Sequence, residues 1–286
     1  MEFKFKFKCK YIILILMIGI INSCNLKEKG KIPGYIRINE AKLKVKLNEG
    51  SNTHKIVDVW VNVDGKLQGV YELPVTFPLI ETGKRKITLR AGIKVNGISK
   101  NRQKYPFYKM IIIDTTIIED FILTFYPEFE YKEDVVFKWI EDFSYNGHSL
   151  EKMPESDTLL YIQRDSSNNY FGKFMIDNTR KNFFYKSSEE FELPKDGTPV
   201  YLELDYKCNH PFIVGVIANN IMNSITIPYL VINPHPNKYN HIYIYLTDVI
   251  LKNTNAKSFN IFIRSSLQDG YNVGEFEIDN IKLLHF

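Results

Sequence analysis

The C-terminal stretch Phe276-Glu277-Ile278-Asp279-Asn280-Ile281-Lys282-Leu283 decides the fold of this 286-residue chain. Apolar and polar residues alternate on either side of its Asp-Asn pair, which is typical of a β-strand with one buried face. Alternation recurs upstream in short segments bounded by Gly, Pro and Asn, and no long stretch keeps a 3.6-residue period. The sequence therefore predicts a chain that is nearly all β.

The first half of the chain contains predicted strands rich in Val, Ile, Tyr and Phe, at residues 42–47, 56–63, 86–89, 110–113 and 117–125. Asp64-Gly65 interrupts one of these runs as a hairpin turn would. The chain is too long for one compact sandwich, since domains run to about 100 to 150 residues. We expect a boundary at 126–134, where a strand ends at a proline before an acidic cluster. The predicted domains are residues 35–131 and 132–286.

Residues 59–89 contain Val59-Trp60-Val61-Asn62-Val63-Asp64-Gly65-Lys66, then Gly69-Val70-Tyr71 and Leu73-Pro74, then Thr82-Gly83-Lys84-Arg85-Lys86. This order resembles the small Ig-like β-sandwich called the PEGA or carboxypeptidase-regulatory-like module. The resemblance implies a spacer or surface adapter without catalytic activity. We expect Pro74 and Pro78 at sheet edges, because proline cannot donate a ladder hydrogen bond.

The second domain opens with Glu141-Asp142-Phe143, continues through Phe171-Gly172-Lys173-Phe174 and the runs 200–206, 241–247 and 259–263, and closes with the quoted stretch. It resembles the galactose-binding-like jelly roll of carbohydrate-binding modules, whose last strand ends in an I-D-N-I-x-L run. The resemblance implies that the last strand pairs with the first. The expected fold is an Ig-like sandwich followed by a jelly roll.

The same resemblance implies a structural calcium ion, the one cofactor considered for this chain. Asp142 and Asp279 match the general positions of its carboxylate ligands, and Ca²⁺ takes six to eight oxygen ligands. The alternative is that Asp279 and Asn280 cap the strand through backbone hydrogen bonds. Both interpretations stay open at this point.

Two loops supply candidate ligand-binding residues, because binding residues tend to lie on loops of a rigid sandwich. Residues 233–240 include His235 and Tyr239, and residues 164–170 end with Tyr170. Both segments can also be ordinary solvated turns. We expect the two tryptophans, Trp60 and Trp139, in the core or at an interface.

The N-terminus has the three parts of an export signal. Four lysines within residues 4–10 precede an apolar run at 11–21, which is shorter than the roughly 20 residues of a bilayer span. Ser23 then precedes Cys24, so the segment resembles a bacterial lipoprotein signal whose cysteine is acylated, for example with palmitate. Ile21 and Asn22 depart from the usual pattern, and a plain secretory signal or an uncleaved anchor is the alternative. Residues 1–23 are then the signal peptide and 24–34 a lipidated tether.

Charge, histidine spacing and motif content argue against nucleic-acid binding and catalysis. Residues 1–23 hold four of the 37 basic and one of the 33 acidic residues, so the remainder has 33 against 32 and gives no electrostatic case for nucleic acid. The six histidines show no zinc-ligand spacing, and no nucleophile elbow, phosphate loop or dinucleotide motif is present. We expect no enzyme, and we expect Cys208 to be buried as a small apolar residue.

A basic and aromatic strip at residues 94–109 is the remaining local feature. One interpretation is a surface that contacts lipid headgroups or an acidic partner. The other is a solvated hairpin.

Two functional hypotheses follow. The first is a non-enzymatic lipoprotein of the Gram-negative envelope, anchored in the outer membrane through Cys24, whose jelly roll binds an extracellular glycan or another ligand. The second is an accessory or scaffold subunit of an outer-membrane assembly, secretion or uptake complex. Whether the protein faces the periplasm or the cell surface stays open.

Overall fold

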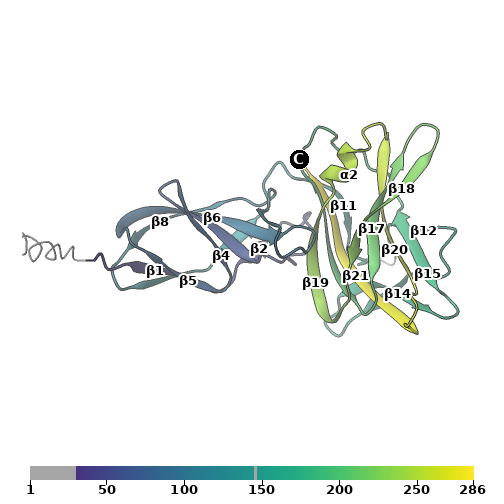
Figure 1. Cartoon of the computed structure of the whole chain (residues 1–286), viewed down its shortest axis with the longest axis horizontal. Coiled ribbons are helices and arrows are strands. Elements are labelled where there is room, and N and C mark those ends of the chain that lie inside the picture. The colour runs from purple at the N-terminus through teal and green to yellow at the C-terminus, as the bar shows by residue number, and fades with distance from the viewer. Residues whose placement is uncertain (1–29, 145–146) are drawn as a thin grey trace, which may run out of the picture.

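The computed structural model describes residues 30–144 and 147–286, and these form two β-sandwiches that follow one another along the long axis of the molecule (Figure 1). The predicted export signal and Cys24 lie outside the described residues. The predicted all-β fold class is confirmed. Within the described part the only α-helix is α2 (Thr247–Leu251). No helix there is long and apolar enough to cross a bilayer.

The first sandwich contains the ten strands that precede residue 131. One layer has the order β4-β3-β6-β7, with β8 also paired to β6; the other layer consists of the sheets β5-β1-β9 and β10-β2. Their bounds are β1 (Gly34–Ile38), β2 (Lys42–Lys44), β3 (Asp58–Val63), β4 (Lys66–Glu72), β5 (Val75–Leu79), β6 (Gly83–Lys94), β7 (Arg102–Lys104), β8 (Ile111–Ile117), β9 (Ile122–Phe125) and β10 (Glu128–Glu130).

The turns of this sandwich test two local predictions. Asp64 and Gly65 both have positive φ, 49° and 82°, and close the β3–β4 hairpin, which confirms the predicted turn. A single strand over residues 117–125 is wrong, because β8 ends at Ile117 and the chain turns at Asp120, whose φ is 55°, before β9 begins. Pro78 lies in the edge strand β5, as predicted.

The jelly roll consists of two packed sheets. The first has the order β13-β14-β21-β16-β19, with β11 also paired to β21, and the second has the order β12-β15-β20-β17-β18. The bounds are β11 (Val136–Glu141), β12 (Leu150–Lys152), β13 (Tyr161–Arg164), β14 (Tyr170–Asp177), β15 (Asn182–Ser187), β16 (Val200–Cys208), β17 (Phe212–Asn219), β18 (Ser224–Ile232), β19 (His235–Tyr245), β20 (Ser258–Ser266) and β21 (Val273–His285).

The closing strand β21 pairs antiparallel with the first strand β11, which confirms the pairing expected from the I-D-N-I-x-L run. It also pairs with β14 and β16, so it lies at the centre of its sheet. Opposite β16, one extra residue is inserted between Asp279 and Lys282, and Asn280 has a φ of 51°. This bulge explains why Ile278 and Ile281 both reach the core although they are three residues apart.

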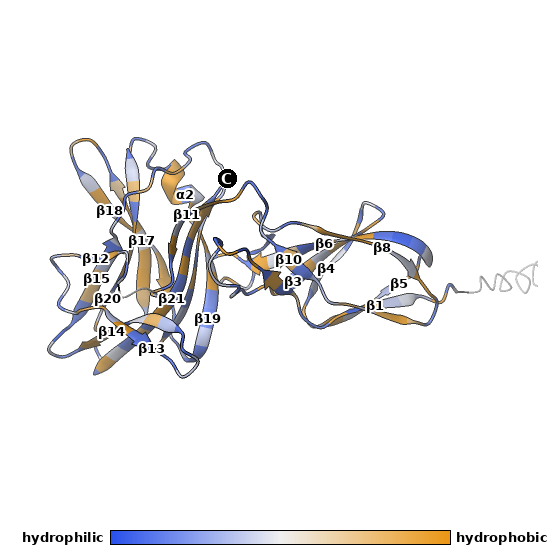
Figure 2. Ribbon diagram, turned by 180° about the vertical axis from the view of Figure 1, so that it is seen from behind, coloured by the Kyte–Doolittle hydropathy of each residue, from blue (hydrophilic) through white to orange (hydrophobic). Residues whose placement is uncertain are grey.

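The core of the jelly roll lies between its two sheets and is aromatic. Phe174 stacks on Phe183 with centroids 4.3 Å apart, and both side chains are fully buried. Trp139 and Cys208 also belong to this core, as the sequence predicts. Figure 2 shows hydrophobic residues along β17 inside the jelly roll, whereas the first residues of β19 are hydrophilic.

The first sandwich covers part of the outer face of the first jelly-roll sheet. Tyr201, Tyr243 and Leu284 of the jelly roll share one buried cluster with the first sandwich and are at most 2% exposed. Tyr105 and Phe107 pack edge-on against Tyr201 at 5.3 and 5.8 Å. The aromatic residues of the strip at 94–109 are therefore interface core, and neither a lipid-facing surface nor a solvated hairpin describes them.

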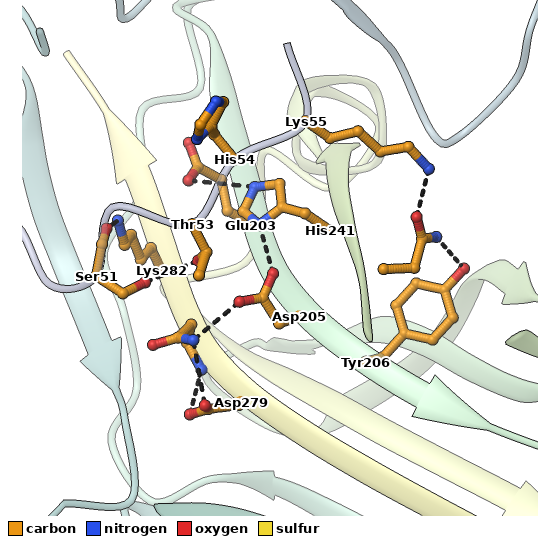
Figure 3. A network of polar contacts seen from close by, with 12 residues as sticks. Ser51, Thr53, His54, Lys55, Glu203, Asp205, Tyr206, His241, Asp279 and Lys282 are labelled. Carbon is orange, nitrogen blue, oxygen red and sulfur yellow. Dashed lines mark hydrogen bonds and ion pairs between the residues drawn. The ribbon is translucent and has the colours of Figure 1, made fainter. Parts of the chain in front are cut away.

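A buried carboxylate lies at the centre of this interface. Glu203 on β16 is fully buried and accepts hydrogen bonds from the hydroxyls of Tyr105 and Tyr131, the latter at 2.9 Å. Beside it, Lys282 donates to the Ser51 carbonyl of the first sandwich (Figure 3). Charged and polar groups from both sandwiches thus satisfy each other where water is excluded.

We predict that Tyr131→Phe lowers the free energy of unfolding by about 1.5 to 3 kcal/mol, because it leaves a buried carboxylate oxygen without its donor. The matched control is Tyr126→Phe, since Tyr126 is 76% exposed and its change should stay within about 0.5 kcal/mol. Urea unfolding of both variants measures the difference. Equal effects at the two positions would contradict the role given to the buried hydroxyl.

Candidate functional site

The jelly roll has two outer sheet faces, and the first sandwich covers part of one of them. On the first sheet the burial of Tyr201, Glu203 and Tyr243 marks the covered part, whereas Tyr161 on β13 and Glu275 on β21 stay exposed. The outer face of the second sheet has no such cover and carries a groove of about 740 Å³. That volume lies within the usual range of small-ligand sites, about 300 to 1,000 Å³.

A small buried apolar cluster lies on the outer side of the second sheet, and of its three buried residues Phe184 lines the groove. Phe184 on β15, Phe262 on β20 and Ile217 on β17 point outward and make a cluster separate from the main core. Successive side chains of a strand point to opposite faces of the sheet. The neighbours of these residues, Phe183, Ile263 and Val216, therefore point into the core. Phe184 and Phe262 contact each other edge-on at 5.2 Å.

Gly215 leaves space for the Phe262 ring of this cluster. A Cβ atom at this position would lie 2.4 Å from a ring carbon of Phe262 and 2.4 Å from the Ile227 carbonyl oxygen. Any side chain here would displace the ring or the neighbouring strand β18. The glycine is therefore required by the close approach of the Phe262 ring to β17.

Arg264 is the main polar group of the groove. Its guanidinium lies 5.8 Å from the ring centroid of Phe184 and 5.7 Å from that of Phe262, within cation–π range. No hydrogen bond or ion pair joins its side chain to another residue in the ranges 30–144 and 147–286. The planar donor fork is thus oriented by aromatic contacts and keeps its donors for a ligand.

Polar residues surround the arginine. The lining includes Ser266 and Gln268 at the end of β20, Asn182 on the adjacent strand β15, and Glu155 and Thr226 from other segments. Asn182 is oriented by donating to Asp157 at 2.8 Å. The groove is therefore lined by apolar side chains together with several hydroxyl and amide groups.

The three ligand-binding residues expected from the sequence lie outside this groove and do not form one site. Tyr239 lines a separate hollow of about 650 Å³ between the sandwiches, where its ring meets Phe171 edge-on at 6.3 Å. His235 begins β19 and its Nδ1 lies 2.8 Å from the Lys238 carbonyl oxygen. Tyr170 packs against the jelly-roll core and contacts Arg164.

The two residues expected at a calcium site are close enough for their charges to interact. Burial raises the pKa of Asp279 to about 7, and the negative charges of Asp205 and Asp142 act in the same direction. The oxygens of Asp279 accept hydrogen bonds from the Asn280 backbone N–H at 2.7 Å and from Asn169 at 2.8 Å. In the described residues no group of three or more His, Cys, Asp or Glu could hold a metal ion, so calcium stays a prediction.

Asp205 is a second buried acidic residue whose charge acts on Asp279. Burial acts to raise the pKa of Asp205, but hydrogen bonds from His241, at 2.7 Å, and from Asn280 outweigh it and lower the pKa. Asp205 is therefore the charged member of this carboxylate pair, and Asp279 holds its proton to higher pH.

Comparison with known proteins gives similarity in structure only. No protein-family model matches the chain, and no curated protein matches it in sequence. The xylan-binding CBM22-2 domain of Paenibacillus barcinonensis Xyn10C matches 52% of this chain and 99% of its own, with 10% identity and a TM-score of 0.39.

Two further carbohydrate-binding modules match to a similar degree. A family 30 module covers 54% of this chain and 84% of its own, with 15% identity and a TM-score of 0.35. The family 11 module from Clostridium thermocellum covers 49% and 91%, with 12% identity and a TM-score of 0.35. Because these identities and TM-scores are low, a function has to be inferred from the groove itself.

The sequence did not locate the groove for a physical reason. Phe184, Phe262 and Arg264 belong to strands in which both faces carry large residues, so period-two alternation cannot separate the core face from the open face. The unpaired Arg264 between aromatic neighbours is visible only once β15 and β20 are paired.

We predict that the effect of Asp279→Asn on stability changes with pH. With a folded pKa of about 7 and an ordinary pKa of 3.8, the folded chain keeps a proton that the unfolded chain releases between these values. Stability of the natural protein from this group is therefore present below about pH 4 and is lost as the pH rises to 7.

The asparagine variant does not titrate there, so its unfolding free energy should rise relative to the natural protein by about 1.4 kcal/mol per pH unit within this window. Urea unfolding at pH 5 and pH 8 measures the change, with Asp248→Asn, at an exposed helix position, as the matched control. A difference that is the same at both pH values would refute the buried, protonated state of Asp279.

Proposed function

We propose that the jelly roll binds a glycan in the groove on the outer face of its second sheet. The observation that carries this proposal is Arg264, whose donors are unpaired within the described residues and whose guanidinium is fixed over Phe184 and Phe262. A sugar presents hydroxyl oxygens to such donors and an apolar C–H face to neighbouring apolar side chains. Half-buried Ile213 and exposed Val231 extend the apolar lining along the groove.

The composition of the groove supports binding without hydrolysis. Glycoside hydrolysis generally uses a pair of carboxyl groups on either side of the scissile bond. Glu155 is the one carboxylate among the described residues that line the groove. The groove is therefore suited to holding a sugar chain and lacks the acid–base pair that would cleave it.

We propose in addition that the chain is held at a membrane by acylation of Cys24. The export-signal pattern of residues 1–24 supports this, and so does the direction in which the chain enters the fold. Strand β1 begins at the pole of the first sandwich that points away from the jelly roll (Figure 1). A membrane anchor before β1 would therefore place the groove far from the bilayer, where a glycan could reach it.

We predict that Arg264→Ala weakens glycan binding at least about tenfold, since a hydrogen-bonded charged group contributes about 1.5 to 3 kcal/mol. A carbohydrate array identifies the ligand, and isothermal titration then compares the variants. Arg37→Ala is the matched control, because Arg37 is an exposed arginine of the first sandwich.

Unchanged affinity in Arg264→Ala would place the ligand elsewhere. No binding on the carbohydrate array, together with stable co-purification of an outer-membrane protein, would favour the scaffold hypothesis and contradict the glycan proposal.

We predict that Cys24→Ala moves the protein from the membrane fraction to the soluble fraction and abolishes incorporation of a labelled fatty acid. Fractionation and metabolic labelling measure both effects. Cys9→Ala is the matched control, since this cysteine lies inside the predicted signal peptide. Membrane association and labelling that persist in Cys24→Ala would exclude acylation at this residue.

A further inference from the structure

A small pocket lies between the two sandwiches and shares Val231 with the lining of the proposed glycan groove. It has a volume of about 220 Å³ and is lined by the end of β6, by Lys55, and by residues of β16, β18 and β19. Its lining contains two lysines and two histidines, Lys55, Lys94, His235 and His241, together with asparagine and tyrosine side chains. No aspartate or glutamate of the described residues lines it.

The positive charges at this pocket lack acidic partners. In residues 30–144 and 147–286, no ion pair joins Lys55, Lys94 or the neighbouring Lys238 to a carboxylate. Burial lowers the pKa of Lys55, and the charges of Lys94 and Lys238 lower it further. The three lysines therefore repel one another, and a bound anion would relieve this repulsion.

The nearest buried carboxylates are already occupied by other groups. Asp205 accepts hydrogen bonds from His241 and Asn280 (Figure 3). Glu203 accepts hydrogen bonds from Tyr105 and Tyr131. Lys55 reaches in the other direction and donates to Asn240, whose own amide donates to the Tyr206 hydroxyl at 2.7 Å. This contact orients the Lys55 ammonium at the pocket but leaves its charge uncompensated.

The walls of the pocket are fixed relative to each other by backbone contacts across the domain boundary. Val95 and Tyr243 form a parallel bridge, and the Asn96 N–H donates to the Tyr243 carbonyl at 2.8 Å. The Asn96 side-chain oxygen accepts from the Tyr245 N–H at 2.9 Å. A ligand here therefore meets a preorganised set of donors contributed by both sandwiches.

We propose that this pocket binds a small tetrahedral oxyanion, a phosphate or sulfate group, and that the bound anion stabilises the arrangement of the two sandwiches. The lysine ammonium groups supply the charge. Asn233 and His235 also line the pocket and carry N–H groups.

Inorganic phosphate and sodium sulfate are the probes, each compared with sodium chloride at equal ionic strength. Thermal melting of the chain without residues 1–23 should show a larger shift with both oxyanions than with chloride, because an anion that binds only the folded state stabilises it. Sulfate and phosphate also stabilise proteins non-specifically, so the comparison between variants decides the outcome.

In Lys94→Gln, titration calorimetry should show at least about tenfold weaker phosphate binding, and the extra thermal shift should disappear. Lys84→Gln on β6 is the matched control and should behave like the natural protein. Lys238→Gln, at an exposed position, provides a second test if the Lys94 variant does not fold. An equal oxyanion effect in the natural protein and in the lysine variants would overturn the proposal, as would no effect beyond chloride.

Binding of phosphate without sulfate, or the reverse, would support the pocket and identify which of the two groups the ligand carries.

Discussion

The burial of Glu203 is the constraint on which the arrangement of the molecule depends. A carboxylate removed from water is costly unless donors surround it, and leaving one unpaired is strongly destabilising. Here the donors come from Tyr105 and Tyr131, which precede the jelly roll in the chain, so Glu203 is satisfied only when the two sandwiches are joined. The surrounding aromatic cluster supplies the apolar burial, and the carboxylate fixes which orientation is allowed.

This constraint also decides where a ligand can bind. The first sandwich covers part of the first jelly-roll sheet but not the outer face of the second, where Arg264 lies against Phe184 and Phe262. The contact between the sandwiches creates the small cationic pocket as well, because Lys55 and Lys94 come from the first sandwich and His235 from the second. Both proposed sites are therefore consequences of how one sheet is covered.

Sequence patterns predicted the elements whose signals are local. The Asp64-Gly65 hairpin follows from turn chemistry, and the pairing of β21 with β11 was expected from the I-D-N-I-x-L run. The interface could not be predicted in this way, because Tyr105 and Phe107 look the same in a hairpin, a strand or a domain contact. The loop signals at Tyr239, His235 and Tyr170 predict exposed binding residues, but strand pairing and packing place the three apart. Lipidation of Cys24 and calcium binding stay predictions.

The central claim is that the free face of the second jelly-roll sheet is the binding face. Hydrogen–deuterium exchange of the whole chain, with and without a saturating oligosaccharide found by array, tests it most directly. We expect slower exchange in the strands and turns around Arg264, including β15, β20 and residues 264–268. Protection confined to β19 and the loop at 233–240, with none around Arg264, would contradict the claim.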